Sequence, residues 1–216
     1  RIVLPDTLQI IQAEAFYHSE LQSVSIPASM TFIGRSAFAY TPIESLTFAP
    51  NAQVKTIEQS AFEKTEKLGS VVIPASVTTM GRAVFKNSGI ISLTFADGFS
   101  MTEIPEEAFA YTHISTVTIP NSVTVINHNA FREIKELKSV TLGSGEGLMI
   151  MSNVFYQSGL ETVYIPENVE YVGEYAFVGL SNLTEFTVSE NNPFYKAVGG
   201  LLVSKNGRKL ISVPAG

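Results

Sequence analysis

The residues suited to proton transfer are scattered along this chain. The sequence contains a unit of 22 to 24 residues that repeats along the chain. Its three histidines, His18, His113 and His128, stand at different positions within that unit. A nucleophilic mechanism needs a carboxylate and a nucleophile that converge on one imidazole. The sequence places neither at a matching position in a neighbouring repeat, so we expect structural or surface histidines.

Glu103, Glu106 and Glu107 suggest paired carboxylates or a cation site. Pro105 lies among them, in a unit with an inserted loop, and such short acidic runs are usually solvated. We therefore predict a solvated charged edge at these three glutamates.

The segment 143–147 has the glycine content of a phosphate-binding loop. It lacks the lysine and the following helix that such a loop needs, so we reject that reading. The chain has no cysteine, which excludes disulfides, thiolate zinc sites and a cysteine nucleophile. We expect neither catalysis nor a metal nor a cofactor.

Composition indicates a folded chain with a large core, because 45% of residues are hydrophobic and 16% are charged. The net charge is −6 and no basic patch is present, so nucleic acid is not expected as a partner. No apolar run has the length of a membrane span, so we expect no membrane insertion in this segment.

The elements that position these residues repeat along the chain. Eight phenylalanines, most preceded by a small residue, recur at steps of 22 to 24 residues: Phe16, Phe38, Phe62, Phe85, Phe109, Phe131, Phe155 and Phe177. Such a period is typical of a solenoid, in which each coil buries its apolar face against its neighbours. The phenylalanines are expected to form one continuous column.

Each unit carries a segment in which apolar residues alternate with Ser or Thr, the pattern of a half-buried strand. Val24 and Ile26 are inward residues of one such segment. A second segment, such as 30–33, is either extended or a short turn. In the segment 148–151 the sequence leaves open which two of the four apolar side chains point inward.

Long and short units alternate from the third unit on, which gives a super-period of 46 or 47 residues. The extra residues are Asn, Gly, Ser and Pro, which favour loops. We expect these insertions to gather on one edge of the solenoid.

The tail 189–216 departs from the repeat. Asn206-Gly207 between apolar runs predicts a β-hairpin with both residues at positive φ, which that type of turn needs. The segment 189–216 is expected to cap the solenoid of residues 1–188 with this hairpin, or to begin a linker. Because the chain opens at Arg1 with no signal segment or cap, we expect a fragment or a processed form with coils missing upstream.

The unit Ile-Pro-x-Ser-Val-x-x-Ile-Gly-x-x-Ala-Phe, followed by Leu-x-x-Val-x-Ile, resembles the BspA-like, Treponema-type leucine-rich repeat. The resemblance covers nearly the whole chain and implies a right-handed, mainly β superhelix of about eight coils of 22–24 residues. Where the family commonly has Cys, three residues after each Phe, this chain has Ser19, Thr41, Thr65, Ser88, Thr112, Ile134, Ser158 and Leu180. Gly199 replaces an expected Asp in the tail.

The outward residues of the strands form the candidate binding surface. Most are Ser or Thr, which are also simply good exposed strand residues. Tyrosine offers a large rigid area with a polar tip, so the C-terminal end is favoured. The candidate residues are Thr118, Thr141, Tyr164, Tyr171, Tyr175, Glu185 and Thr187. A second set just after the spine phenylalanines favours packing at the turn: Tyr17, Tyr40, Tyr111 and Tyr156.

The resemblance implies a secreted or cell-surface bacterial protein that adheres to host matrix proteins or to other bacteria. We therefore expect a non-catalytic, extracellular binding scaffold whose ligand is a protein. Two alternatives stay open: a structural spacer within a larger surface protein, and a glycan-binding module, which the absence of Trp disfavours.

Overall fold

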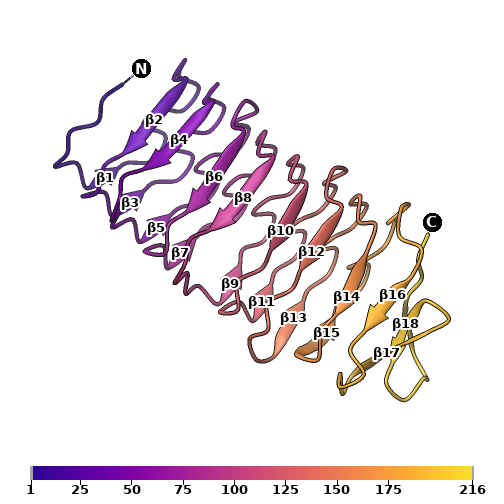
Figure 1. The fold of residues 1–216 in the computed structure, drawn as a ribbon. Helices are drawn as coiled ribbons and strands as arrows, with labels where there is room; N and C mark the ends of the chain where they lie inside the picture. The colour runs from indigo at the N-terminus through magenta and orange to yellow at the C-terminus, as the bar shows by residue number, and fades with distance from the viewer. Residues whose placement is uncertain (1, 216) are drawn as a thin grey trace.

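The computed structural model describes residues 2–215, which wind into a β-solenoid of eight coils followed by a small antiparallel sheet (Figure 1). Arg1 and Gly216, the outer ends of the two predicted segments, lie outside the described residues. No α-helix occurs in residues 2–215, and so no helix there has the length and apolar character needed to cross a membrane.

Every coil gives one strand to each of two rows. Strand row A contains β2 (Ser23–Ile26), β4 (Ser45–Phe48), β6 (Ser70–Ile73), β8 (Ser92–Phe95), β10 (Thr116–Thr118), β12 (Ser139–Thr141), β14 (Val163–Ile165) and β16 (Phe186–Val188). Strand row B contains β1 (Ile10–Ile11), β3 (Phe32–Ile33), β5 (Thr56–Ile57), β7 (Thr79–Met80), β9 (Glu103–Ile104), β11 (Val125–Ile126), β13 (Leu148–Ile150) and β15 (Val169–Val172). The second segment of each unit is therefore extended.

All pairing within the two rows is parallel, and it keeps one register except between β13 and β15, where the register shifts between Leu148 and Met149. In row A the ladders join strands in twos, β2 with β4, β6 with β8, β10 with β12 and β14 with β16. Each pair joins the strand of a short unit to the strand of the unit that follows it. The two-unit super-period of the sequence is therefore also the period of the hydrogen bonding in row A. A single bridge, Ser139 to Thr162, links β12 with β14.

The predicted phenylalanine column is confirmed. Consecutive rings stack nearly parallel, with centroids 5.0 to 5.8 Å apart and interplanar angles of 4° to 15°. Phe186 ends the column by meeting Phe177 edge-on at 5.6 Å. The inward strand residues complete the core, and in 148–151 the buried pair is Leu148 and Ile150.

A third ladder runs along the turns that hold the phenylalanines, and the sequence analysis did not anticipate it. In all eight coils the residues two before and two after the Phe have positive φ, and only Gly179 among these sixteen is a glycine. Amides of Ser36, Phe38 and Tyr40 donate to carbonyls in the next coil at 3.0, 2.8 and 2.9 Å. These bonds offset the cost of the left-handed conformation.

The C-terminal segment forms a three-stranded antiparallel sheet of β17 (Tyr195–Val198), β18 (Leu201–Ser204) and β19 (Leu210–Ser212). The tight turn lies at Gly199-Gly200, with φ of 57° and 78°. The prediction that both residues of Asn206-Gly207 take positive φ is wrong, since only Gly207 does. The Asn206 side chain instead accepts hydrogen bonds from the Ser204 hydroxyl and the Arg208 amide and closes a wider loop.

Candidate binding surface

Four of the seven candidate residues form one line across the last four coils of row A. Thr118 is in register with Thr141, and Tyr164 is in register with Thr187. The bridge between Ser139 and Thr162 brings Thr141 level with Tyr164. All four side chains are exposed, and Tyr164 is 54% exposed. The geometry thus joins these four into a single strip.

The other three candidate residues lie around that strip. Glu185 is exposed, immediately before β16, in the same outward column as Thr162. Tyr171 lies on β15 in row B, in register with Met149, and Tyr175 follows in the turn with φ of 60°. The three tyrosines are therefore divided between row A, which holds Tyr164, and row B with its following turn, which hold Tyr171 and Tyr175.

Figure 1 shows no segment crossing the middle of the outer face of row A. At the start of the row, the N-terminal residues Ile2, Val3, Leu4 and Asp6 line a groove together with outward side chains of β2 and β4. Its sixteen outward side chains, two per coil, are all exposed or partly exposed. Glu185 is the only charged residue among them. The face is therefore hydroxyl-rich and accessible.

Charge is distributed unevenly along the solenoid. Residues 139–195 contain no Lys or Arg and seven glutamates, Glu146, Glu161, Glu167, Glu170, Glu174, Glu185 and Glu190. The exposed tyrosines of the candidate surface lie within this acidic segment, whereas the rest of the chain is nearly neutral.

The histidines have surface roles, with one correction. His113 Nδ1 lies 3.3 Å from Glu136 Oε1 in the adjacent coil, so the prediction that no acid matches a histidine across coils is wrong. Both side chains are largely exposed, and no described nucleophile bonds to this pair. His18 stacks on Tyr40 at 4.7 Å between centroids.

Glu107 is not part of a solvated edge, which corrects the prediction for that residue. Its side chain is only 15% exposed and bonds to Arg82 and Lys86, each at 2.8 Å. Partial burial alone would raise the pKa of Glu107, but the hydrogen bonds from Lys86 and Arg82 outweigh it and lower the pKa. Glu103 and Glu106 are more exposed, as expected.

The glycines of 143–147 serve packing. A Cβ atom at Gly143 would lie 2.6 Å from the carbonyl oxygen of Pro120, and one at Gly145 would overlap the carbonyl of Asn121. Within residues 2–215, no group of three or more His, Cys, Asp or Glu side chains is arranged to hold a metal ion.

The second tyrosine set packs at the turns, as predicted. Tyr17 meets Tyr40 edge-on at 5.5 Å. Basic side chains cover three of the rings: Lys64 over Tyr40, Lys86 over Tyr111 and Arg132 over Tyr156 at 6.0, 5.9 and 4.9 Å.

Two rows of short parallel strands, stacked coil on coil around an aligned phenylalanine column, define a leucine-rich-repeat solenoid. The BspA type leucine rich repeat region matches residues 1–101 and 102–197, with six copies. The chain belongs to that family. No curated protein matches it in overall sequence.

Three solved structures share the fold. The pneumococcal vaccine antigen PcpA is 22% identical with a TM-score of 0.68, over 96% of this chain and 50% of PcpA. A leucine-rich repeat protein from Bacteroides ovatus is 20% identical with a TM-score of 0.59, over 86% of this chain and 53% of its own. A leucine-rich repeat protein from Eubacterium ventriosum is 21% identical with a TM-score of 0.50, over 80% of this chain and 39% of its own. The chain spans about half or less of each relative.

Proposed function

We propose that the chain is the binding scaffold of a secreted or surface-displayed bacterial protein, which adheres to a host matrix protein or to another cell through strand row A. The observation that carries the proposal is the open outer face of that row, which ends in the strip containing Tyr164 and Thr187. Surface display is carried over from the family and from the relative that is a vaccine antigen.

The chemistry of the strip supports a protein ligand. Tyrosine is enriched where proteins meet, because its ring supplies apolar area while its hydroxyl stays solvated. Tyr164 is among the most exposed aromatic residues and has no cation over its ring in the described residues. The surrounding glutamates favour a ligand surface that carries Lys or Arg, so binding should weaken as salt rises.

The test is binding to wells coated with purified matrix proteins, with a glycan array beside it. The variant is Tyr164→Ala, which changes row A alone, and the matched control is Tyr17→Ala, which removes one tyrosine of similar exposure from the turns. Saturable binding that only the first variant reduces supports the proposal. Binding to no protein of the panel contradicts it and favours a spacer, and binding to glycans alone favours a glycan-binding module.

A further inference from the structure

The solenoid has one junction at which neither strand row continues from one coil to the next. Numbered from the N-terminus, coil 4 contains β7 and β8, and coil 5 contains β9 and β10. The row B ladder runs β1-β3-β5-β7 and starts again as β9-β11-β13-β15, so it stops between coils 4 and 5. One of the breaks in row A, between β8 and β10, lies at the same place. At every other junction between the described coils, at least one row is hydrogen-bonded.

A proline explains the break in row B. In six coils the residue that follows the row B strand donates its amide to the coil before, at 2.8 to 3.0 Å: Gly34, Glu58, Gly81, Asn127, Met151 and Gly173. In coil 5 this residue is Pro105, which has no N–H to donate. The equivalent bond to Met80 in coil 4 therefore cannot form.

A second proline explains the break in row A. After the row A strands of coils 2 and 4, the amides of Ala49 and Ala96 donate to the coil before at 2.9 Å. Coil 5 has Pro120 at the equivalent position and lacks this donor too. Pro74 and Pro166 take the same position at the other two breaks of row A. Among coils 2–8, only coil 5 has proline at both positions.

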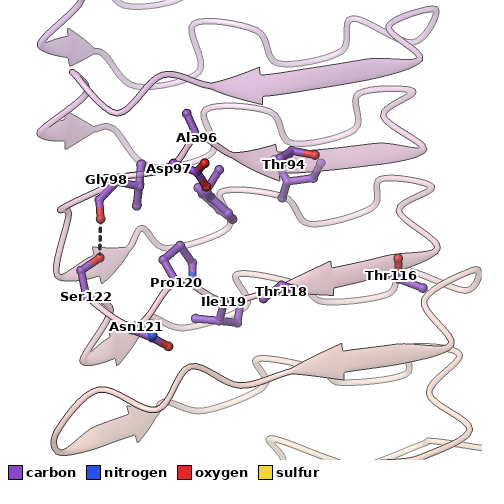
Figure 2. A pocket seen from close by; sticks show the side chains of 13 residues that line it. Thr94, Ala96, Asp97, Gly98, Thr116, Thr118, Ile119, Pro120, Asn121 and Ser122 are labelled. Carbon is purple, nitrogen blue, oxygen red and sulfur yellow. Dashed lines mark hydrogen bonds between the residues drawn. The ribbon is translucent and has the colours of Figure 1, made fainter.

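A groove lies over the double break on each face. Figure 2 shows the groove between β8 and β10, of about 490 Å³, with Thr94 on one wall and Thr116 on the other. The groove over row B has a volume of about 380 Å³ and is lined by Thr79 of coil 4 and Pro105 of coil 5. Both grooves lie where a hydrogen-bonded ladder would otherwise close the surface.

The bonds that remain across this junction are concentrated at the phenylalanine turns. Amides of Ala83, Phe85 and Asn87 in coil 4 each donate to a carbonyl of coil 5 at 2.9 Å. Beside them, the Glu107 carboxylate of coil 5 bonds to Arg82 of coil 4 at 2.8 Å. The turn side of the junction is therefore firmly held.

The opposite side of the junction is held much more weakly. Amides of His113 and Ser115 donate to coil 4 at 3.0 and 3.3 Å, but they lie before β10, on the side of the turns. Beyond the strands, one hydrogen bond in the described residues joins loop 96–101 to loop 119–123. It runs from the Ser122 hydroxyl to the carbonyl of Phe99 at 3.1 Å, and Figure 2 marks it with a dashed line.

We propose that the junction between coils 4 and 5 is a hinge, about which the two four-coil halves rotate with the turn ladder as the axis. Opening breaks the Ser122 bond and widens the groove between β8 and β10. Phe85 and Phe109 lie next to the axis and stay stacked, and their centroid distance of 5.8 Å is the longest step of the column. The strip from Thr118 to Thr187 lies wholly in coils 5–8, so the hinge sets its angle to the first half of row A.

The experiment measures distances between two nitroxide labels by electron paramagnetic resonance, in the full chain, which has no cysteine of its own. Val72→Cys/Thr141→Cys places the labels on row A in coils 3 and 6, across the hinge. The matched pair Ser25→Cys/Thr94→Cys spans the same number of coils within the first half, and crosses a break of row A alone. All four are exposed strand positions.

Two substitutions then change the hinge in opposite directions. Pro105→Asn gives coil 5 the amide that Asn127 supplies in coil 6, and so restores a donor toward coil 4. Ser122→Ala removes the bond between the loops. Ser29→Ala is the control, because it removes the equivalent bond, to Leu8 at 2.7 Å, far from the hinge.

The expected result is a broader distance distribution across the hinge than within the first half. Pro105→Asn should narrow the distribution across the hinge, Ser122→Ala should broaden it, and Ser29→Ala should leave it unchanged. Equal distributions for the two label pairs, or no response to Pro105→Asn in a variant that circular dichroism shows to be folded, overturn the proposal. If Pro105→Asn does not fold, the two label pairs and Ser122→Ala still decide. The hinge does not depend on the ligand of row A, so this proposal and the proposed function fail separately.

Discussion

The hydroxyl oxygen of Tyr195 accepts a hydrogen bond of 2.9 Å from the backbone amide of Val172, at the end of strand row B. The next amide, of Gly173, donates to Ile150 in the preceding coil. Neighbouring amides of a strand point to opposite sides. The amide of Val172 therefore faces the side where a further coil would lie, and Tyr195 supplies the acceptor that such a coil would provide.

Replacing Tyr195 by Phe should lower the free energy of unfolding by about 1–3 kcal/mol, because a buried amide is left without an acceptor. Urea denaturation measures the loss. Tyr164→Phe removes a hydroxyl from an exposed ring and should change stability by less than about 0.5 kcal/mol. Equal effects of the two substitutions would show that Tyr195 does not end the ladder.

Phe109→Ala should cost about 3–5 kcal/mol, since the ring is fully buried between two stacked neighbours. Phe16 is only partly buried and stacks on one ring, so Phe16→Ala should cost clearly less. Denaturant unfolding of both variants tests this difference. Equal losses would contradict an aligned column whose interior members matter most.

Glu107→Gln should lower the free energy of unfolding at neutral pH by on the order of 1 kcal/mol, and with it the thermal midpoint, because it weakens the bonds to Arg82 and Lys86. The pKa of Glu107 is lowered in the folded chain. Its contribution is therefore fully present above the ordinary pKa of 4.5 and is lost as pH falls through the lower folded pKa.

The gap between the midpoints of the wild type and Glu107→Gln should accordingly close on acidification below about pH 4.5. Glu103→Gln is the control, because Glu103 is exposed and bonds only to the Asn127 amide. A gap that persists unchanged at about pH 3 would contradict the ionic role of Glu107.

Gly34→Ala should cost about 1–3 kcal/mol, because the added Cβ would lie 2.5 Å from the backbone nitrogen of Ala13 in the coil before. Gly69→Ala places its Cβ in open space and should be neutral or stabilising by up to about 1 kcal/mol. Thermal unfolding of both variants distinguishes close coil-to-coil approach from a general intolerance of alanine.

The repeated core could be predicted from sequence because the same physical demand recurs in every coil. Phe38 and Val24 each have equivalents at fixed steps, and each lies where the pattern indicated. The super-period likewise located the inserted loops, since their Asn, Gly, Ser and Pro content has a direct conformational meaning.

The features that escaped prediction depend on contacts between coils. Tyr40 and Lys64 take positive φ without any glycine signal, because bonds to the next coil hold them there. Whether Glu107 meets Arg82 is decided by how neighbouring loops align. The separation of Tyr164 in row A from Tyr171 in row B likewise depends on how the coil folds, which the local sequence pattern does not indicate.

The central claim is that a protein ligand binds the outer face of strand row A, and the absence of cysteine allows a direct test. Thr141→Cys places one thiol on row A and Thr79→Cys places one on row B, both at exposed strand positions. Each variant is coupled to a maleimide-linked polyethylene glycol chain and assayed on the matrix-protein panel. The account predicts that the label at position 141 abolishes binding and that the label at position 79 leaves it intact. Binding that survives the label at 141, or is lost equally with the label at 79, would contradict it.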